Sequence, residues 1–130
     1  MAGGEVQLLG GIFKTSVLID IKHSQRLIIG HDSVIKPQSN IDVVKLYQES
    51  GIIGGGIDVT DAAGWNKGCI VWDTLDRGNF MDHQRIWIGD IKFIGAGLGT
   101  CILAEITYAG ADNAVIEDVG GDHFYMYNFA

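Results

Sequence analysis

The sequence contains almost no proline, few cysteines and no long apolar run. One proline and two cysteines occur in 130 residues, so nothing indicates a disulfide scaffold. The apolar runs reach only about five residues, which is too short to cross a bilayer. The opening MAGGEVQLLGG has neither the charged start nor the long apolar stretch of a signal peptide. We therefore expect no membrane insertion and a location in the cytoplasm or in a virion.

Basic residues are scarce as well. Lys and Arg together number 9 and Asp and Glu number 16, which gives a formal net charge of −7. A negative surface repels nucleic-acid phosphates and anionic lipid headgroups. The charge therefore argues against nucleic acid and membrane surfaces as partners.

Glycine, in contrast, occurs 19 times, and 47% of the residues are hydrophobic. The length fits one domain with one core, over residues 1–130. The apolar residues come in short alternating runs broken by glycine or asparagine, and this alternation predicts strands. We therefore expect an all-β protein. The runs are VLIDIK, RLII, DVVKLY, CIVW, IWIGDIKFI, CILAEI, AVIEDV and HFYMYNF.

The runs repeat at nearly regular intervals. Five of them each offer one inward-facing apolar pair, at spacings of 25, 26, 32 and 22 residues. A second series of pairs, each five residues apart, lies between them and brackets short corners. Two interleaved series predict a solenoid of about five coils whose strands stack as parallel sheets. The inward pairs are Ile19/Ile21, Val44/Leu46, Ile70/Trp72, Ile102/Ala104 and Phe124/Met126, and the second series is Ile52/Ile57, Ile86/Ile91 and Ala114/Val119.

The segment Gly54-Gly55-Gly56 lies at one of these corners. A phosphate-binding loop would need a helix after the glycines, and in its strong form a lysine followed by serine or threonine. The chain continues instead as IDVTDAAG, without a helix-forming run or a lysine. We therefore expect a tight bend between two strands.

Three segments resemble the opening of a right-handed parallel β-helix of the pectate-lyase-like superfamily. They are GGEVQLLGGIF, RLIIGHDSVIK and GIIGGGIDV. Members often have Gly-Gly-x-Val-x-Leu-x-x-Gly-x-Phe, then I-x-G-x-G-x-x-T-V-I, then I-x-G-x-x-I-D. The resemblance covers residues 3 to about 120 and implies a right-handed helix. The matching residues are Gly3, Gly4, Val6, Leu8, Gly11, Phe13, Ile29, Gly30, Val34, Ile35, Ile53, Gly54, Ile57 and Asp58.

The resemblance also implies a type of ligand and an assembly. The superfamily includes pectate lyases, polygalacturonases, viral tail spikes and adhesins, and most members bind or cleave polysaccharide. Tail spikes are often trimers, so the resemblance implies a homo-oligomer such as a trimer. Enzymes of the superfamily usually have more coils and an amphipathic helix before the first strand. We therefore expect a module without activity of its own, with open ends covered by another chain or another copy.

Two rows of residues alternate with the inward pairs and are expected to face outward. The first row becomes apolar along the solenoid and is expected to be covered by a loop of the same chain or by a subunit. The resemblance to tail spikes favours a subunit interface through Val71, Leu103 and Tyr125. The full row is Asp20, Lys45, Val71, Leu103 and Tyr125.

The second outward row mixes aromatic and charged residues. Aromatic rings stack on sugar rings and carboxylates bond to sugar hydroxyls, so this row is a candidate carbohydrate-binding surface. The alternative is a solvated sheet face whose cross-strand pairs contribute only to stability. Trp65, in the excursion 60–68, is a further candidate. The row is Lys22, Tyr47, Asp73, Glu105 and Tyr127.

Catalysis is the competing hypothesis, as a polysaccharide lyase or glycoside hydrolase. Hydrolysis uses two carboxyl groups, and Asp90 and Asp118 are expected at the same corner of successive coils. Asp76 lies in the longest excursion, 73–85, and a lyase would also use calcium held by carboxylates. The structural alternative is that corner aspartates bond to turn backbone groups. The four histidines lack ligand spacing, so no metal site is predicted.

Cys69 and Cys101 are expected at equivalent positions in neighbouring coils. Parallel neighbours seldom offer the side-chain torsion of a disulfide, and no secretion signal is present. We therefore expect stacked free thiols. Taken together, the sequence predicts a polysaccharide-facing or structural β-helix module, most like part of a viral tail spike, a tail fibre or an adhesin, with no cofactor.

Overall fold

The computed structural model describes residues 4–47, 49–73, 86–105, 119–122 and 125–127. Within these ranges every regular element is a β-strand. The described residues include no helix that is long and apolar enough to cross a membrane. The prediction of an all-β protein is confirmed.

The strands form three parallel sheets, which we call sheets A, B and C. Sheet A contains β1 (Gly4–Leu8), β4 (Gln25–Ile29), β7 (Gly51–Ile53), β10 (Ile86–Gly89) and β13 (Val119–Asp122), in that order. Sheet B contains β2 (Ile12–Thr15), β5 (Val34–Pro37), β8 (Gly56–Asp58), β11 (Lys92–Ile94) and β14 (Tyr125–Tyr127). Sheet C contains β3 (Ile19–Ile21), β6 (Val44–Leu46), β9 (Gly68–Asp73) and β12 (Thr100–Glu105).

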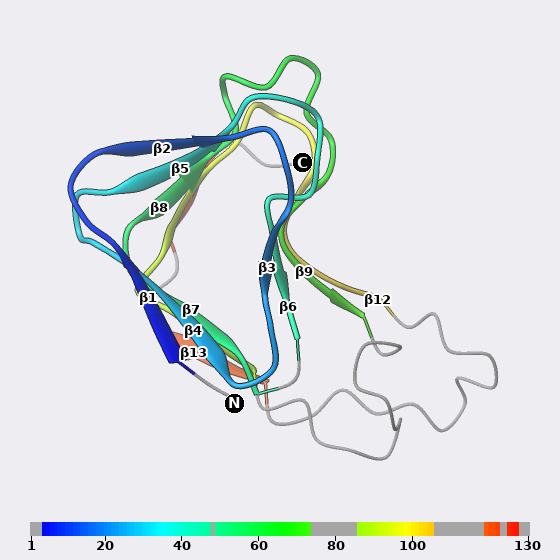
Figure 1. The fold of residues 1–130 in the computed structure, drawn as a ribbon. Coiled ribbons are helices and arrows are strands. Elements are labelled where there is room, and N and C mark those ends of the chain that lie inside the picture. Colours follow the sequence, from blue (N-terminus) through cyan, green and yellow to red (C-terminus); the bar gives the residue numbers. More distant parts are fainter. Residues whose placement is uncertain (1–3, 48, 74–85, 106–118, 123–124, 128–130) are drawn as a thin grey trace, which may run out of the picture.

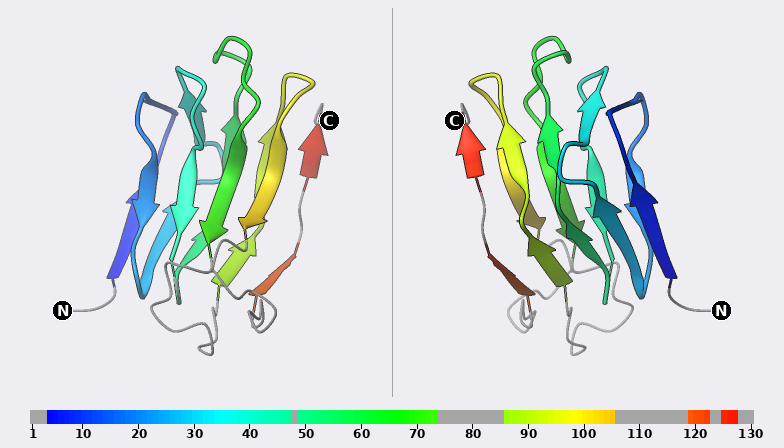
Figure 2. Two further views of the ribbon diagram at one scale, coloured as in Figure 1. Left: turned by 90° about the vertical axis from the view of Figure 1, so that its right-hand side faces the viewer. Right: turned by 90° about the vertical axis from the view of Figure 1, so that its left-hand side faces the viewer.

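Consecutive strands pass from sheet A to sheet B to sheet C, so three strands make one coil. Seen from the N-terminal end, the chain runs clockwise as it recedes, which makes the helix right-handed (Figure 1). The side views show the coils stacked along one axis, with β1 to β3 at one end and β14 at the other (Figure 2). Four coils contribute to all three sheets, and β13 and β14 belong to a fifth. The predicted right-handed parallel β-helix of about five short coils is confirmed.

The core fills the space enclosed by the three sheets. Side chains alternate along each strand, so every second residue points inward and stacks on its partner in the next coil. Three rows account for much of this core, and all of their residues except Ile102 are at most 3% exposed. The rows are Leu27, Ile52 and Ile88 in sheet A, Ile35, Ile57 and Phe93 in sheet B, and Val44, Ile70 and Ile102 in sheet C.

The second predicted series has the correct spacing but the wrong register. The sequence aligns Ile52 with Ile86, whereas the structure pairs Ile52 with Ile88. In the same register, Ile57 pairs with Phe93. Ile86 and Ile88 are both buried, so their apolar character does not distinguish the two alignments.

Gly54 and Gly55 form the corner between β7 and β8, as the sequence predicts. Their φ angles are 88° and 58°, in a region that glycine adopts at little cost. A Cβ atom on Gly55 would collide with the side chain of Ile29 and lie 2.6 Å from the carbonyl oxygen of Ser33. The strand β8 follows directly, so the segment is a bend and not a phosphate-binding loop at a helix N-terminus.

We predict that Gly55→Ala lowers the free energy of unfolding by at least about 2 kcal/mol, because it adds a steric collision to an unfavourable φ. Gly64→Ala is the matched control, since Gly64 has a φ of 64° and a Cβ atom there would meet nothing within 4 Å beyond its chain neighbours. This control should cost only about 1 kcal/mol. Denaturant unfolding of both variants measures the difference, and equal losses would contradict the close packing of this corner.

Candidate functional site

Trp87 is the most conspicuous residue on the outer face of sheet A. Its side chain is 46% exposed, which is unusual for a large aromatic residue inside a sheet. Its neighbours in register are Gly51 of β7 and Gly120 of β13. A Cβ atom on Gly51 would lie 3.7 Å from Cβ of Trp87. The two glycines therefore leave the indole without side chains beside it on the adjacent strands.

A pocket of about 450 Å³ lies on the same face, toward the N-terminal end. Glu5 and Arg26 line it and belong to the same outward row as Gly51 and Trp87. Two steps of the parallel ladder separate Arg26 from Trp87, a distance of about 10 Å along the sheet. The charged pocket and the exposed indole therefore form one continuous surface. The pocket is lined by Gly4, Glu5, Ser24, Arg26 and Glu49.

The corner between sheets C and A supplies the remaining polar groups of the pocket. Ser24 and Glu49 lie 25 residues apart and have φ angles of 59° and 61°, a region that residues other than glycine seldom adopt. The hydroxyl of Ser24 donates to Oε2 of Glu49 at 3.1 Å, and Nε2 of His23 lies 3.7 Å from the same oxygen. Each of the two residues is the third of a four-residue turn, 22–25 and 47–50, closed by a backbone hydrogen bond, and one class of such turns has a positive φ at this position.

Trp87 could not be identified as a site residue from the sequence alone. What distinguishes it is the pair of glycines beside it, and these become its neighbours only through the register of the strands. IWIG predicts a strand with Trp87 facing outward, but the glycines beside it come from segments 36 and 33 residues away. Only the pairing of β10 with β7 and β13 shows that they flank the indole.

Tyr47, a predicted carbohydrate-binding residue, takes part in a charged cluster on the outer face of sheet C. Its hydroxyl donates to Oδ1 of Asp20 at 3.0 Å, and Nζ of Lys22 lies 3.3 Å from the Tyr47 hydroxyl oxygen. Nζ of Lys22 and Nζ of Lys45 lie 4.3 Å and 5.3 Å from the ring centroid. The hydrogen bond to Tyr47, together with Asp20, raises the pKa of Lys22. These lysines would compete with a sugar for the ring of Tyr47.

The other members of the predicted carbohydrate-binding row, Asp73, Glu105 and Tyr127, are only partly where the sequence places them. Asp73 and Glu105 pair in register on sheet C, as the sequence predicts. Tyr125 and Tyr127 do not continue the rows of sheet C, because they pair with Lys92 and Ile94 in sheet B. The predicted placement of both tyrosines is therefore wrong.

Trp65 is a core residue and not a surface one. It is 1% exposed, and its Nε1 donates to the carbonyl oxygen of Ile41 at 2.8 Å. The excursion after β8 folds back over the coil, so that Trp65 packs with Val59 and Ala62 in the core cluster. The prediction that Trp65 binds carbohydrate is wrong, because its ring is inaccessible.

The row of residues that the sequence predicts to form a subunit interface is only partly present in the structure. Val71 pairs with Lys45 and Leu103 in register, so the predicted row is confirmed at these positions. Val71 is however only 8% exposed, which leaves little surface for a second chain. Because Tyr125 belongs to sheet B, the predicted interface of Val71, Leu103 and Tyr125 is not one continuous row.

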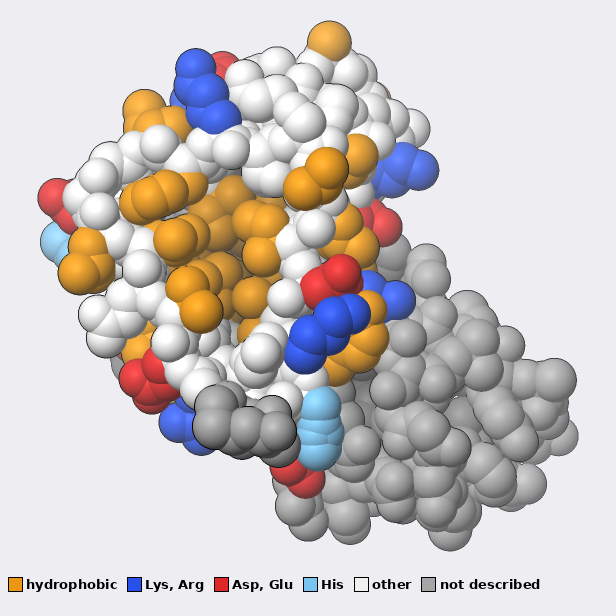
Figure 3. Space-filling model, viewed as in Figure 1, with side chains coloured by type: hydrophobic (Ala, Val, Ile, Leu, Met, Phe, Trp, Pro, Cys, Tyr) orange, Lys and Arg blue, Asp and Glu red, His pale blue; other side chains and the backbone are white. Residues whose placement is uncertain are grey.

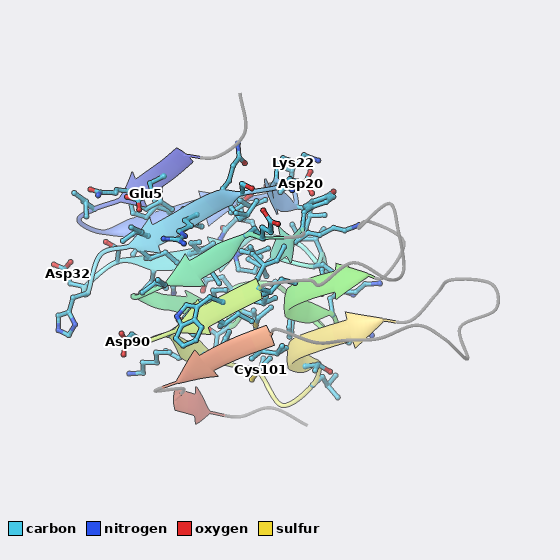
Figure 4. The ribbon with its side chains drawn as sticks, turned by 90° about the horizontal axis from the view of Figure 1, so that it is seen from below. Glu5, Asp20, Lys22, Asp32, Asp90 and Cys101 are labelled. Carbon is cyan, nitrogen blue, oxygen red and sulfur yellow. The ribbon has the colours of Figure 1, made fainter. Side chains whose placement is uncertain are left out.

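The structure does not support the predicted carboxylate pair. Asp76 and Asp118 lie outside the described residues. Asp90 follows β10 at the corner to β11, with a φ of 50°. Val119 pairs with Ile86, so Asp118 precedes its strand whereas Asp90 follows its own, and their predicted equivalence is wrong. Figure 4 shows Asp90 far along the stack from Asp20 and Lys22.

Cys69 and Cys101 are both buried free thiols on sheet C, as predicted. Burial raises the pKa of Cys101 to about 11. Burial, with a contribution from Cys101, raises the pKa of Cys69 still further. In the part of the chain that the structure describes, no three His, Cys, Asp or Glu residues are placed to hold a metal ion.

No protein-family model, curated protein or solved structure matches this chain. The arrangement of the three parallel sheets itself defines the class, a right-handed parallel β-helix. Its function has to be inferred from the surfaces of the sheets.

We predict that Trp87→Phe lowers the fraction of tryptophan fluorescence that acrylamide quenches in the folded protein, because it removes an exposed indole. Trp65→Phe is the control and should leave that fraction unchanged or raise it, since the indole of Trp65 is inaccessible. If Trp65→Phe instead removes the emission that acrylamide quenches, Trp65 is the exposed indole, and the description of Trp87 as the exposed residue of the site is wrong.

We also predict that the folded protein reacts with a disulfide reagent at pH 8 at least about 100-fold more slowly than the unfolded protein, because only thiolates react. The thiols keep their protons in the folded state to a higher pH than in the unfolded state. The free energy of unfolding should therefore fall as pH rises from about 9 toward about 11. Cys101→Ser should weaken this pH dependence, and an unchanged slope in a variant that lacks both cysteines would contradict it.

Proposed function

We propose that this protein is a polysaccharide-binding β-helix module of the pectate-lyase-like type, as found in viral tail spikes and fibres, and that it is not catalytic on its own. One observation carries the proposal. The exposed indole of Trp87 lies between two glycines, in line with the charged pocket at Arg26 and Glu5.

Trp87 supplies the apolar part of such a site. Tryptophan is a rigid, amphipathic side chain that contributes a large contact area at low entropic cost. The C–H face of a sugar ring can lie flat on the indole, because neither Gly51 nor Gly120 has a side chain that competes for this space.

The pocket supplies the polar part. Ligand sites combine an apolar surface with a few polar groups that fix the orientation of the ligand. The guanidinium of Arg26 and the carboxylates of Glu5 and Glu49 can donate to and accept from sugar hydroxyls. The row runs along the axis of the helix, so a sugar chain aligned with the axis would pass Trp87 first and Arg26 next.

The charge favours a neutral polysaccharide. The chain carries a net charge of −7, and the pocket has two carboxylates for one guanidinium. A polyuronate would be repelled over most of the surface, and more strongly at low salt. We therefore propose neutral hexose or N-acetylhexosamine polymers as ligands.

A titration with neutral and acidic oligosaccharides tests the proposal. Trp87→Ala should lower the affinity for a neutral oligosaccharide by about 10- to 100-fold, the effect of losing a central aromatic contact. Leu98→Ala is the control, because Leu98 is a large apolar residue that is 53% exposed and lies outside the row. The affinity of this variant should match that of the unmodified protein.

The same preparations should be assayed for reducing ends and unsaturated sugars, with and without calcium. We expect binding without turnover. Turnover would contradict the non-catalytic assignment, and a panel-wide lack of binding, or equal affinities for Trp87→Ala and Leu98→Ala, would contradict the site.

A further inference from the structure

The first coil exposes an unusual amount of apolar side chain. Val6, Leu9, Ile12 and Val17 are 60–70% exposed, and they are four of the six most exposed large apolar residues in the described ranges. Figure 3 views the molecule from this end and shows apolar side chains gathered inside the ring of coils. A concentration of this kind at one end marks an interaction surface.

The same end carries the open edges of all three sheets. β1, β2 and β3 are the outermost strands of sheets A, B and C. The carbonyl oxygens of Leu8, Thr15 and Ile21 accept hydrogen bonds from the second coil, at 2.7, 2.8 and 3.2 Å. Backbone groups alternate in direction along a strand, so those of the preceding residues point toward the open end. These preceding residues are Gln7, Lys14 and Asp20.

A fitting partner must offer three strand edges that surround an apolar centre. A single helix or strand would leave most of the open backbone groups unpaired. The first coil of a second copy has the required edges. A two-fold axis perpendicular to the helix axis, through the middle of β2, places β2 antiparallel to β2 of the copy and β1 antiparallel to β3 of the copy, so that the rise of the coil leaves the same gap at every edge. All three edges then pair at once, and the assembly closes at two copies.

Charge also favours a second copy at this end. The chain carries a net charge of −7, so two copies repel one another over most of their surface. Within residues 4–22, Glu5 and Asp20 balance Lys14 and Lys22, so the first coil is neutral. Contact through this end brings the neutral coils together and holds the acidic remainders apart.

We propose that this protein forms an end-to-end, two-fold symmetric dimer through the edges of β1, β2 and β3 and the apolar side chains between them. This surface is distinct from the row of Val71 and Leu103, and the proposal does not depend on carbohydrate binding. The dimer presents two copies of the Trp87 face on one rigid rod.

Analytical ultracentrifugation of the full chain tests this proposal. The unmodified protein should sediment as an elongated particle of twice the monomer mass, without larger species. Val6→Lys should raise the dissociation constant of the dimer by at least about 30-fold, because it places an unpaired charge in the apolar contact. Leu98→Lys adds the same charge at an exposed apolar residue far from this end and should leave the dissociation constant unchanged.

Circular dichroism establishes that each variant is folded. If Val6→Lys does not fold, Phe13→Lys in β2 provides the same test, because Phe13 pairs with the buried Ile35 and so faces the apolar centre. A monomer at all concentrations overturns the proposal, as does a mass that grows beyond two copies. A dimer that forms equally well in the unmodified protein and in a folded Val6→Lys or Phe13→Lys variant overturns it too.

Discussion

The register of the parallel ladder between coils determines the rest of this structure. Side chains alternate with a period of two, so each pairing decides both which residue is buried and which one lies outside. The pairing of Ile52 with Ile88 buries both residues, and the next pair in the same ladder places Gly51 beside Trp87. The core and the candidate site are therefore two sides of one alignment.

The corners maintain this alignment from coil to coil. Gly54 and Gly55 allow the chain to turn from sheet A to sheet B where a side chain would collide with the coil beneath. Between sheets B and C, Nδ2 of Asn40 donates to Oδ1 of Asn66 at 3.0 Å, and the backbone N–H of Asn66 donates to Oδ1 of Asn40 at 3.0 Å. Such reciprocal side-chain bonds satisfy turn backbone groups. They also fix the height of one coil above the next.

Much of the fold could be predicted from the sequence because its signals are local. Alternating runs predict strands, glycines predict corners, and the spacing of Val44 and Ile70 predicts their stacking. The register of the fourth coil could not be predicted in this way, because Ile86 and Ile88 are both apolar and both become buried. The burial of Trp65 could not be predicted either. The excursion that contains it is rich in polar residues, and nothing in this local pattern indicates that the indole packs in the core.

The proposed carbohydrate-binding face depends most directly on the alignment of β7 with β10, and solution NMR can measure this alignment. We predict nuclear Overhauser contacts between the side chains of Ile52 and Ile88, and between Ile57 and Phe93. Contacts of Ile52 with Ile86 instead would move Trp87 from Gly51 to a position opposite Ile53. The indole would then have a bulky neighbour in place of a glycine, and the proposed carbohydrate-binding face would be contradicted.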